Sequence, residues 1–257
     1  MISFLSQLKQ RNKLFFYYGL FSFIGCFIMM MLYQQQPFIV AGANAWAKPF
    51  KFFLSIAVLC WTMGWLLHEL NEPKKVRMYT IMSVVMMTIE LVIITWQAAN
   101  GRLSHFNQST PLYGALYALM GVAILTFTCW TAYITFLFFK LKSDTITPNY
   151  LLSIQLGLLF FVIFSFEGGV MSAFNKHTIG GNDGSPGIPL LGWSYYLGDL
   201  RVAHFFGIHS LQVLPLMGAY FTTSKKQVWL FGILYFILVS MMLLQAFLKV
   251  PFIEKAL

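Results

Sequence analysis

Residues 149–175 read NYLLSIQLGLLFFVIFSFEGGVMSAFN, an apolar run whose one charged side chain is Glu167. As an α-helix this run would measure about 40 Å at 1.5 Å per residue, which exceeds the roughly 30 Å of hydrocarbon in a bilayer. A run of this length and composition predicts a transmembrane helix, and six further runs pass the same test.

The composition of the whole chain agrees with a membrane setting. Hydrophobic residues make up 58% of the 257 residues and charged residues only 10%, against about 25% charged residues in a typical soluble domain, and the mean hydropathy is +0.71. The formal charge of +9 comes from 17 Lys and Arg residues scattered in small groups, which is typical of membrane topology rather than of a nucleic-acid-binding face. We therefore expect a lipid bilayer as the partner, and no nucleic acid.

The apolar runs predict an all-α bundle of seven transmembrane helices in a single domain, residues 1–257. The expected helices cover residues 14–33, 50–70, 77–98, 111–139, 149–175, 199–221 and 228–248. Ten Lys and Arg residues fall in the N-terminus and in the alternate loops 71–77, 140–148 and 222–227, against seven on the opposite side. Because Lys and Arg are enriched in cytoplasmic loops, this bias predicts a cytoplasmic N-terminus and a non-cytoplasmic C-terminus.

The longest outer connection, residues 176–198, contains the turn-forming sequence GGNDGSPG at 180–187. Gly and Pro at this density indicate tight turns. Trp193, Tyr195 and Tyr196 follow them and would suit the headgroup level of a membrane. Two interpretations stay open, an interfacial loop anchored by aromatic side chains and a lid over the polar site described next.

Ionisable side chains inside the expected helices are the strongest functional signal, because such groups are costly in a bilayer and normally face a cavity or a partner. Glu90 and Glu167 each lie about eight residues from the outer end of their helix, hence roughly 10–12 Å deep. Residues 199–212, DLRVAHFFGIHSLQ, enter from the same side and carry His204 and His209 about 7 and 15 Å below Asp199. The topology predicts four ionisable side chains from three helices at one depth.

Angular positions on the sixth helix predict a wide pocket. They are measured from His204 at about 100° per residue. Arg201, Gln212 and His209 then lie near 60°, 80° and 140°. This arc favours one cavity lined by all four side chains and argues against a two-histidine clamp. Pro215 is expected to distort the helix, although the sequence shows neither a broken helix nor an inverted repeat.

The third helix adds Gln97, which lies on the same face as Glu90 and leads to the loop at 100–107, expected to close over the pocket. The predicted site combines three groups of residues. The candidate catalytic residues are Glu90, Glu167 and Arg201. The candidate substrate-binding residues, for a small-molecule or lipid ligand, are Gln97, Arg102, Asn107 and Gln212. The candidate metal ligands are His105, His204 and His209, together with Glu90 and Glu167.

Four interpretations of this cluster stay open. Imidazole and carboxylate groups suit zinc or iron, so a metal-dependent membrane enzyme is the leading hypothesis, although no HExxH or HxxxH spacing is present. Histidines can also bind haem b in a redox protein. The same side chains can relay protons or hold a small solute in a transporter, and Arg201 can pair with a carboxylate in a purely structural network. Without a P-loop, GxGxxG or GxSxG motif, ATP-driven chemistry is not expected.

Two strings, WQAANGRLSHFN at 96–107 and GDLRVAHFFGIHSLQ at 198–212, resemble those of uncharacterised multi-pass bacterial membrane proteins. The resemblance covers most of the chain. It implies a setting in the inner (plasma) membrane, and it implies no activity, cofactor or substrate. Seven-helix membrane metal hydrolases of the ceramidase and progestin-receptor type differ, because their last helix carries an HxxxH motif and residues 228–248 contain no histidine.

Overall fold

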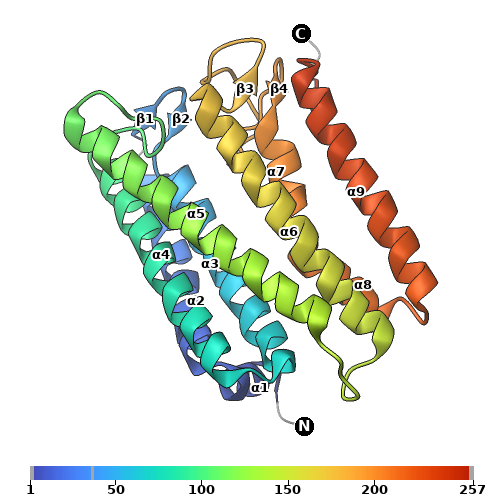
Figure 1. Ribbon diagram of the computed structural model, residues 1–257. Helices are drawn as coiled ribbons and strands as arrows, with labels where there is room; N and C mark the ends of the chain where they lie inside the picture. Colours follow the sequence, from blue (N-terminus) through green and yellow to red (C-terminus); the bar gives the residue numbers. More distant parts are fainter. Residues whose placement is uncertain (1–2, 36–37, 255–257) are drawn as a thin grey trace. The chain divides into compact units, whose positions relative to one another are not determined.

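The structure is a computed structural model that describes residues 3–35 and 38–254, and these residues are mostly helical (Figure 1). Six helices are long and apolar enough to cross a membrane. A seventh span results if two consecutive helices, α7 (Leu200–Ile208) and α8 (Ser210–Tyr220), count as one bent span. The chain is therefore an integral multi-pass membrane protein, and the predicted α-helical fold class is confirmed.

Two compact units divide the chain, Met1–Trp130 (unit 1) and Thr131–Leu257 (unit 2). A long helix, α5 (Pro111–Lys140), runs through the boundary and contributes its first part to unit 1 and its last part to unit 2. The single domain expected from the sequence stays a prediction.

Unit 1 begins with a short helix and continues with three helices of membrane length. The helices are α1 (Phe4–Arg11), α2 (Lys13–Gln35), α3 (Ala47–Leu66) and α4 (Pro73–Ala99). A small antiparallel pair, β1 (Ile39–Val40) and β2 (Ala43–Asn44), connects α2 to α3, and a 3-10 turn, η1 (Leu67–Leu70), follows α3.

Close packing of α2 on α3 depends on glycines. A Cβ at Gly19 would overlap the Trp61 ring, and a Cβ at Gly25 would overlap the Phe53 ring. Small residues let neighbouring membrane helices approach and let large aromatic side chains fill the space between them. This explains why glycines occur inside an otherwise apolar span.

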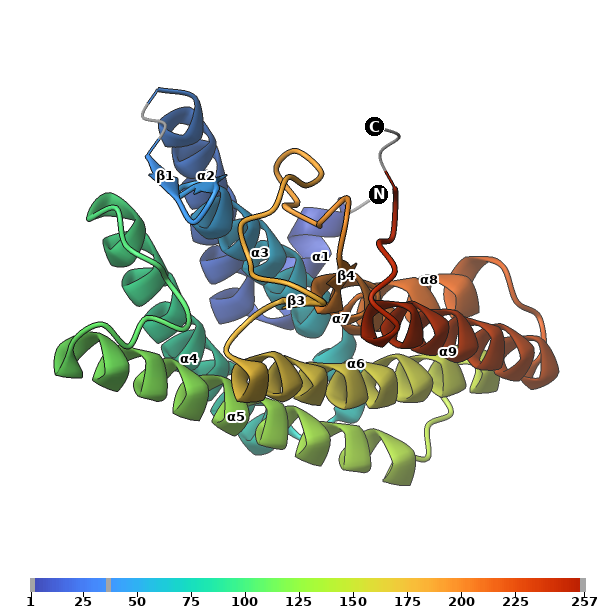
Figure 2. The same cartoon turned by 90° about the horizontal axis from the view of Figure 1, so that it is seen from above.

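Unit 2 continues from the end of α5 with a membrane-length helix, a structured loop at residues 175–199 and three further helices. Its elements are α6 (Pro148–Phe174), β3 (Thr178–Ile179), β4 (Gly198–Asp199), α7, α8 and α9 (Lys225–Phe247). Figure 2 shows α6 and α9 side by side, and α7 packs against both of them.

Three N-caps define where the helices of unit 2 begin. The side chains of Thr147, Asp199 and Ser224 accept hydrogen bonds from backbone N–H groups in the first turns of α6, α7 and α9. Such caps satisfy N–H groups that have no partner within the helix. The Asp199 cap places the start of α7 directly after the loop at residues 175–199.

The contact between α6 and α8 is the tightest in unit 2. Ser210 Oγ donates to the Gly157 carbonyl oxygen at 3.0 Å, and a Cβ at Gly157 would lie 2.9 Å from the Ser210 carbonyl oxygen. Farther along, Asn149 Nδ2 donates to the carbonyl oxygens of Gly218 and Thr222 at 3.1 and 2.9 Å. These contacts fix α8 to α6.

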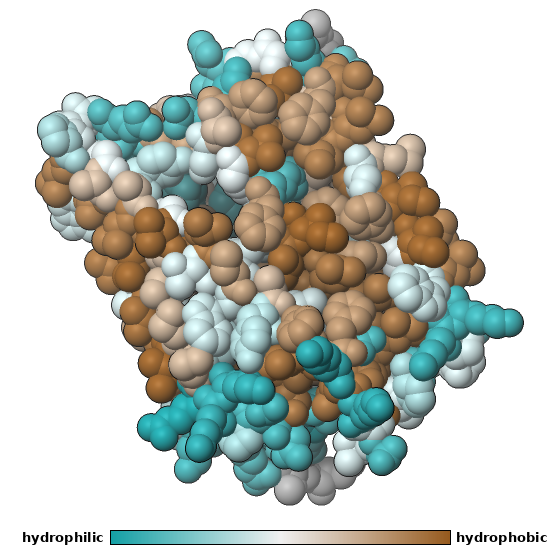
Figure 3. Space-filling view, viewed as in Figure 1, coloured by the Kyte–Doolittle hydropathy of each residue, from teal (hydrophilic) through white to brown (hydrophobic). Residues whose placement is uncertain are grey.

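The outward surfaces of the helices carry large apolar side chains. On the face seen in Figure 3, hydrophobic residues cover the middle of the visible helices and hydrophilic residues gather toward the helix ends. On α9 alone, Leu230, Met241 and Leu244 are 61%, 62% and 58% exposed. Side chains of this kind suit acyl chains as solvent, in agreement with a lipid bilayer as the partner.

Candidate functional site

Each unit contains five of the ten site residues predicted from the sequence. Unit 1 contains Glu90, Gln97, Arg102, His105 and Asn107, and unit 2 contains Glu167, Arg201, His204, His209 and Gln212.

The sixth predicted span is interrupted at His209. The chain bends by 40° between α7 and α8. His209 is the C-cap residue of α7 and also the N-cap residue of α8. Pro215 lies inside α8 rather than at this break, where it cannot donate a hydrogen bond to the carbonyl of Leu211. The span expected over 199–221 is thus present as two helices with a bend between them, and this bend is a broken helix that the sequence did not show.

His204 is held against α6 in one tautomer. Its Nδ1 lies 2.9 Å from the Phe164 carbonyl oxygen, which can only accept, so Nδ1 carries the hydrogen. In the neutral ring Nε2 is then an acceptor. Gly168 leaves room for this arrangement, because a Cβ at that position would lie 3.4 Å from His204 Cε1.

His209 is anchored in a similar way at the break. Its Nδ1 lies 3.1 Å from Gln212 Oε1, and its ring packs edge-on against Phe205 with centroids 4.4 Å apart. As oriented, the amide oxygen accepts and Nδ1 donates. His209 thus contacts Gln212, another residue of the predicted site.

Glu167 is the most unusual polar side chain of unit 2. It is 5% exposed, and neither carboxyl oxygen has a hydrogen-bond partner among the described residues. It precedes Gly168, which faces His204, so it lies at the level of that ring along α6. A buried carboxylate without a donor is costly. This position therefore calls for a proton, a cation or a polar ligand.

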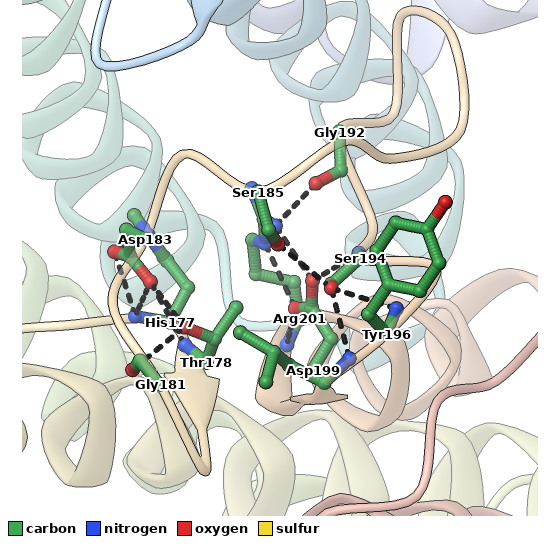
Figure 4. Close-up of polar contacts among 11 residues, drawn as sticks. His177, Thr178, Gly181, Asp183, Ser185, Gly192, Ser194, Tyr196, Asp199 and Arg201 are labelled. Atoms are coloured by element: carbon green, nitrogen blue, oxygen red, sulfur yellow. Dashed lines mark hydrogen bonds and ion pairs between the residues drawn. The ribbon is translucent and has the colours of Figure 1, made fainter.

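Arg201 points into the loop at residues 175–199, where it binds Asp199 (Figure 4). Its Nε donates to Asp199 Oδ1 at 2.8 Å and its Nη2 to Oδ2 at 2.6 Å, and Nη2 also donates to the Gly192 carbonyl oxygen. The Asp199 side chain is fully buried. It also accepts from the backbone N–H groups of Ser194 and Arg201. This geometry gives Arg201 a structural contact, and its predicted catalytic role stays a prediction.

A second carboxylate, Asp183, organises the other half of the loop. It accepts from Nδ1 of His177 at 2.8 Å and from Oγ1 of Thr178 at 2.8 Å, as well as from both of their backbone N–H groups. Burial raises the pKa of Asp183, but hydrogen bonds and the charge of His177 outweigh this and bring the pKa well below its ordinary value. Thr178 pairs with Asp199 across β3–β4, so the two acid-centred clusters lie beside each other (Figure 4).

Trp193 packs this loop against α7. Its side chain is 6% exposed and contacts the rings of Phe205, Phe206 and Phe252 at centroid distances of 5.5, 6.1 and 5.7 Å. The loop is therefore a folded cap on one end of unit 2. Trp193 is packed inside this cap, whereas Tyr196 is 43% exposed and remains suited to the headgroup level.

The polar residues of unit 1 follow one face of α4. Glu90 is 2% exposed and experiences the charge of Lys48 in the first turn of α3. Gln97, two turns farther along, is 1% exposed, and its Oε1 has no hydrogen-bond partner among the described residues. The His105 ring lies 5.6 Å from Phe52. Glu90 and Gln97 are thus buried on one face of α4, and His105 contacts Phe52 of α3.

The remaining unit 1 candidates lie in the loop before α5. Asn107 is buried and shapes a turn, because its Oδ1 accepts from the backbone N–H and hydroxyl of Ser109 at 3.2 and 2.8 Å. Arg102 is exposed. A shallow hollow of about 660 Å³ between residues 108 and 118 includes none of the ten predicted residues.

Metal ligation has little support in the part of the chain that the structure describes. Within residues 3–35 and 38–254, no group of three or more His, Cys, Asp or Glu side chains could hold a metal ion. The ligand set His105, His204, His209, Glu90 and Glu167 is therefore not assembled as a metal centre within either unit.

The residues that organise the cap, Asp183, His177 and Asp199, are not among the site residues predicted from the sequence. Their signals were present, because an Asp inside a glycine-rich turn commonly accepts backbone hydrogen bonds and an Asp before a helix is a common N-cap.

Comparisons with known proteins identify no relative. No protein-family model, no curated protein and no solved structure matches the chain. The family suggested by the two resembling strings is thus not identified.

Proposed function

We propose that this chain transports protons across a membrane, with His204, His209 and Glu167 of unit 2 as the groups that exchange them. The observation that supports this proposal best is the break between α7 and α8 at His209. Discontinuous membrane helices are characteristic of transporter sites, where irregular backbone lines a path for ions or solutes.

The chemistry of the two imidazoles suits proton exchange. Each ring is oriented through Nδ1, by the Phe164 carbonyl or the Gln212 amide. In the neutral form each therefore offers Nε2 as the atom that accepts a proton. Imidazole is the side chain whose ordinary pKa best suits a relay near neutral pH.

Glu167 is the third proposed relay group, because its buried carboxyl has no donor among the described residues. A proton supplies the compensation that this position requires. Intramembrane carboxyls of this kind mark ion and proton pathways in transporters and pumps. Arg201 is proposed to keep the cap closed over this path rather than to exchange protons.

A metal-dependent membrane enzyme is the second candidate. It is favoured by the Nδ1 hydrogen bonds of His204 and His209, since metal-binding histidines usually donate their other ring N–H to a carbonyl or a similar group. Elemental analysis of the purified protein tests this candidate. One zinc or iron ion per chain, lost in His204→Ala, would favour it over proton transport.

Proton transport is tested in liposomes loaded with a pH-sensitive dye. A potassium diffusion potential drives protons inward, and we expect the reconstituted protein to acidify the lumen faster than empty liposomes do. His209→Asn keeps an amide near Gln212 but cannot be protonated, and Glu167→Gln removes the carboxyl. Each should slow acidification at least about 100-fold, the lower end of the usual scale for a proton-transfer group.

The matched control is Glu72→Gln, which removes an exposed carboxylate that pairs with Lys75. It should transport protons at the rate of the unmodified protein. Acidification no faster than in empty liposomes would refute the proposal, and so would full activity in both His209→Asn and Glu167→Gln.

The setting is proposed to be the inner membrane, with the N-terminus in the cytoplasm. Asn182, exposed in the outer cap, provides the test as Asn182→Cys. A membrane-impermeant thiol reagent should label it from the non-cytoplasmic side, and labelling from the cytoplasmic side alone would invert the orientation.

A further inference from the structure

The short helix α1 is fixed to the inner end of unit 1. Leu8 is fully buried, and a Cβ at Gly64 would lie 3.2 Å from its Cδ1. Arg11 Nη1 donates to Glu69 Oε1 at 2.6 Å and to the Trp65 carbonyl oxygen at 3.1 Å. The Arg11 guanidinium also lies 4.0 Å from the Trp65 ring centroid. The helix therefore has a defined place, and so do the residues that it exposes.

Docking of α1 brings together the beginnings of two long helices. Asn12, between α1 and α2, donates through Nδ2 to Thr80 Oγ1 of α4 at 2.9 Å, and its Oδ1 accepts from the Phe15 N–H at 3.0 Å. The N-terminal turns of α2 and α4 are thereby linked. Helix N-termini carry a partial positive charge and attract anions.

Cations occupy these same turns, although helix N-termini disfavour them. Lys13 is the first residue of α2, and Lys74 and Arg77 lie in the first turns of α4. These three residues and Lys9 of α1 are exposed, and none forms an ion pair with an acid among the described residues.

The acidic residues of the connection between α3 and α4 do not neutralise this surface. Glu69 pairs with Arg11 and Glu72 pairs with Lys75. No acidic residue occurs in the first turn of α2 or of α4. Four cations and two helix N-termini therefore leave a positive surface that an anion would complement.

Apolar side chains beside these cations identify the source of the anion. Phe4 and Leu5 of α1 are 52% and 46% exposed, and they lie at the end of a bundle whose outward surfaces suit acyl chains. A docked amphipathic helix with cations next to exposed Phe and Leu suits the headgroup and acyl boundary of a membrane. A free phosphate ion would leave the apolar part of this surface in water.

We propose that the inner end of unit 1 binds anionic phospholipid. Lys9, Lys13, Lys74 and Arg77 contact the headgroup phosphate at the N-termini of α2 and α4, and Phe4 and Leu5 contact the upper acyl chain. The binding surface, called here the α1 surface, consists of these six residues. It is separate from the proton path proposed for unit 2.

The test measures binding of phosphatidylglycerol to the full chain in phosphatidylcholine nanodiscs, with bound lipid counted by native mass spectrometry. Lys13→Gln, Lys74→Gln and Arg77→Gln are combined in one variant. Three lost charges should weaken phosphatidylglycerol binding about 100-fold, at about one kilocalorie per mole for each charge near a membrane surface. These side chains are exposed, so the variant should fold, as checked by circular dichroism.

The matched control combines Lys142→Gln, Lys225→Gln and Lys226→Gln, three exposed lysines of unit 2, so that the change in net charge is the same. It should bind phosphatidylglycerol as the unmodified chain does. Equal loss in the control, or undiminished binding in the α1-surface variant, would refute the proposal. Displacement of the lipid by millimolar inorganic phosphate would also overturn it and identify a phosphate site instead.

Discussion

Replacing Arg201 by Met removes the partner of a fully buried carboxylate while keeping a side chain of similar length. In the present structure Asp199 receives two bonds from the guanidinium and two from backbone N–H groups. The substitution leaves only the two backbone bonds. The Gly192 carbonyl, which accepts from the same guanidinium, also loses its donor.

The expected cost follows from the burial of the two groups. Removing one member of a buried ion pair costs about 3–5 kcal/mol. Arg201 is 28% exposed, so water partly screens the pair, and the backbone donors remain. We therefore expect a loss near the lower limit, about 3 kcal/mol, which corresponds to roughly a 100-fold change in the opening equilibrium of the cap.

Hydrogen exchange in detergent measures this opening directly. The amide of Ser194, which donates to Asp199, should exchange about 100-fold faster in Arg201→Met. The control is Glu72→Gln, because its pair with Lys75 is 36–46% exposed and should be worth less than about 1 kcal/mol. Exchange at Ser194 within threefold of the unmodified protein would refute the assignment of Arg201 as the clamp of the cap.

Two further predictions concern the same cap. The pKa of Asp183 is lowered in the folded state, so the stability that the Asp183 carboxylate contributes is complete above the ordinary Asp pKa near 3.9 and is lost progressively as the pH falls below that value. The cap should therefore become cleavable by pepsin below about pH 4. In Asp183→Asn the cap should be cleavable already above that pH. Gly198→Ala should lower the free energy of unfolding by about 1–3 kcal/mol, since its Cβ would overlap the Ala246 carbonyl oxygen. Gly169→Ala, whose Cβ meets no atom within 4 Å, should instead stabilise α6 by up to about 1 kcal/mol. Equal melting temperatures for the two variants would contradict this prediction.

The membrane spans could be predicted from the sequence because hydrophobic length alone specifies them. The run over 149–175, for example, corresponds to α6 at Pro148–Phe174. The short helix α1 could not be found in this way, because eight residues are too few to show a helical period. Its position depends on tertiary contacts of Leu8 and Arg11.

The site was predictable in part, for a similar reason. Helical angles placed His209 and Gln212 on one side of the sixth span, and the structure joins them by a hydrogen bond. The same angles assigned Arg201 to the deep pocket, whereas Asp199, two residues away, holds it at the loop. Angles calculated for an ideal helix do not include Asp199, because this partner of Arg201 lies before the first residue of α7.

The break at His209 also affects how the chain enters the membrane. Helices α7 and α8 have 9 and 11 residues, about 14 and 17 Å at 1.5 Å per residue, so neither alone crosses roughly 30 Å of hydrocarbon. Their polar groups find carbonyl acceptors on α6, at Phe164 for His204 and at Gly157 for Ser210. Since α6 is synthesised first, the acceptors are in place before their donors leave the ribosome. The order of the chain thus lets a polar, interrupted span insert beside a helix that already accommodates it.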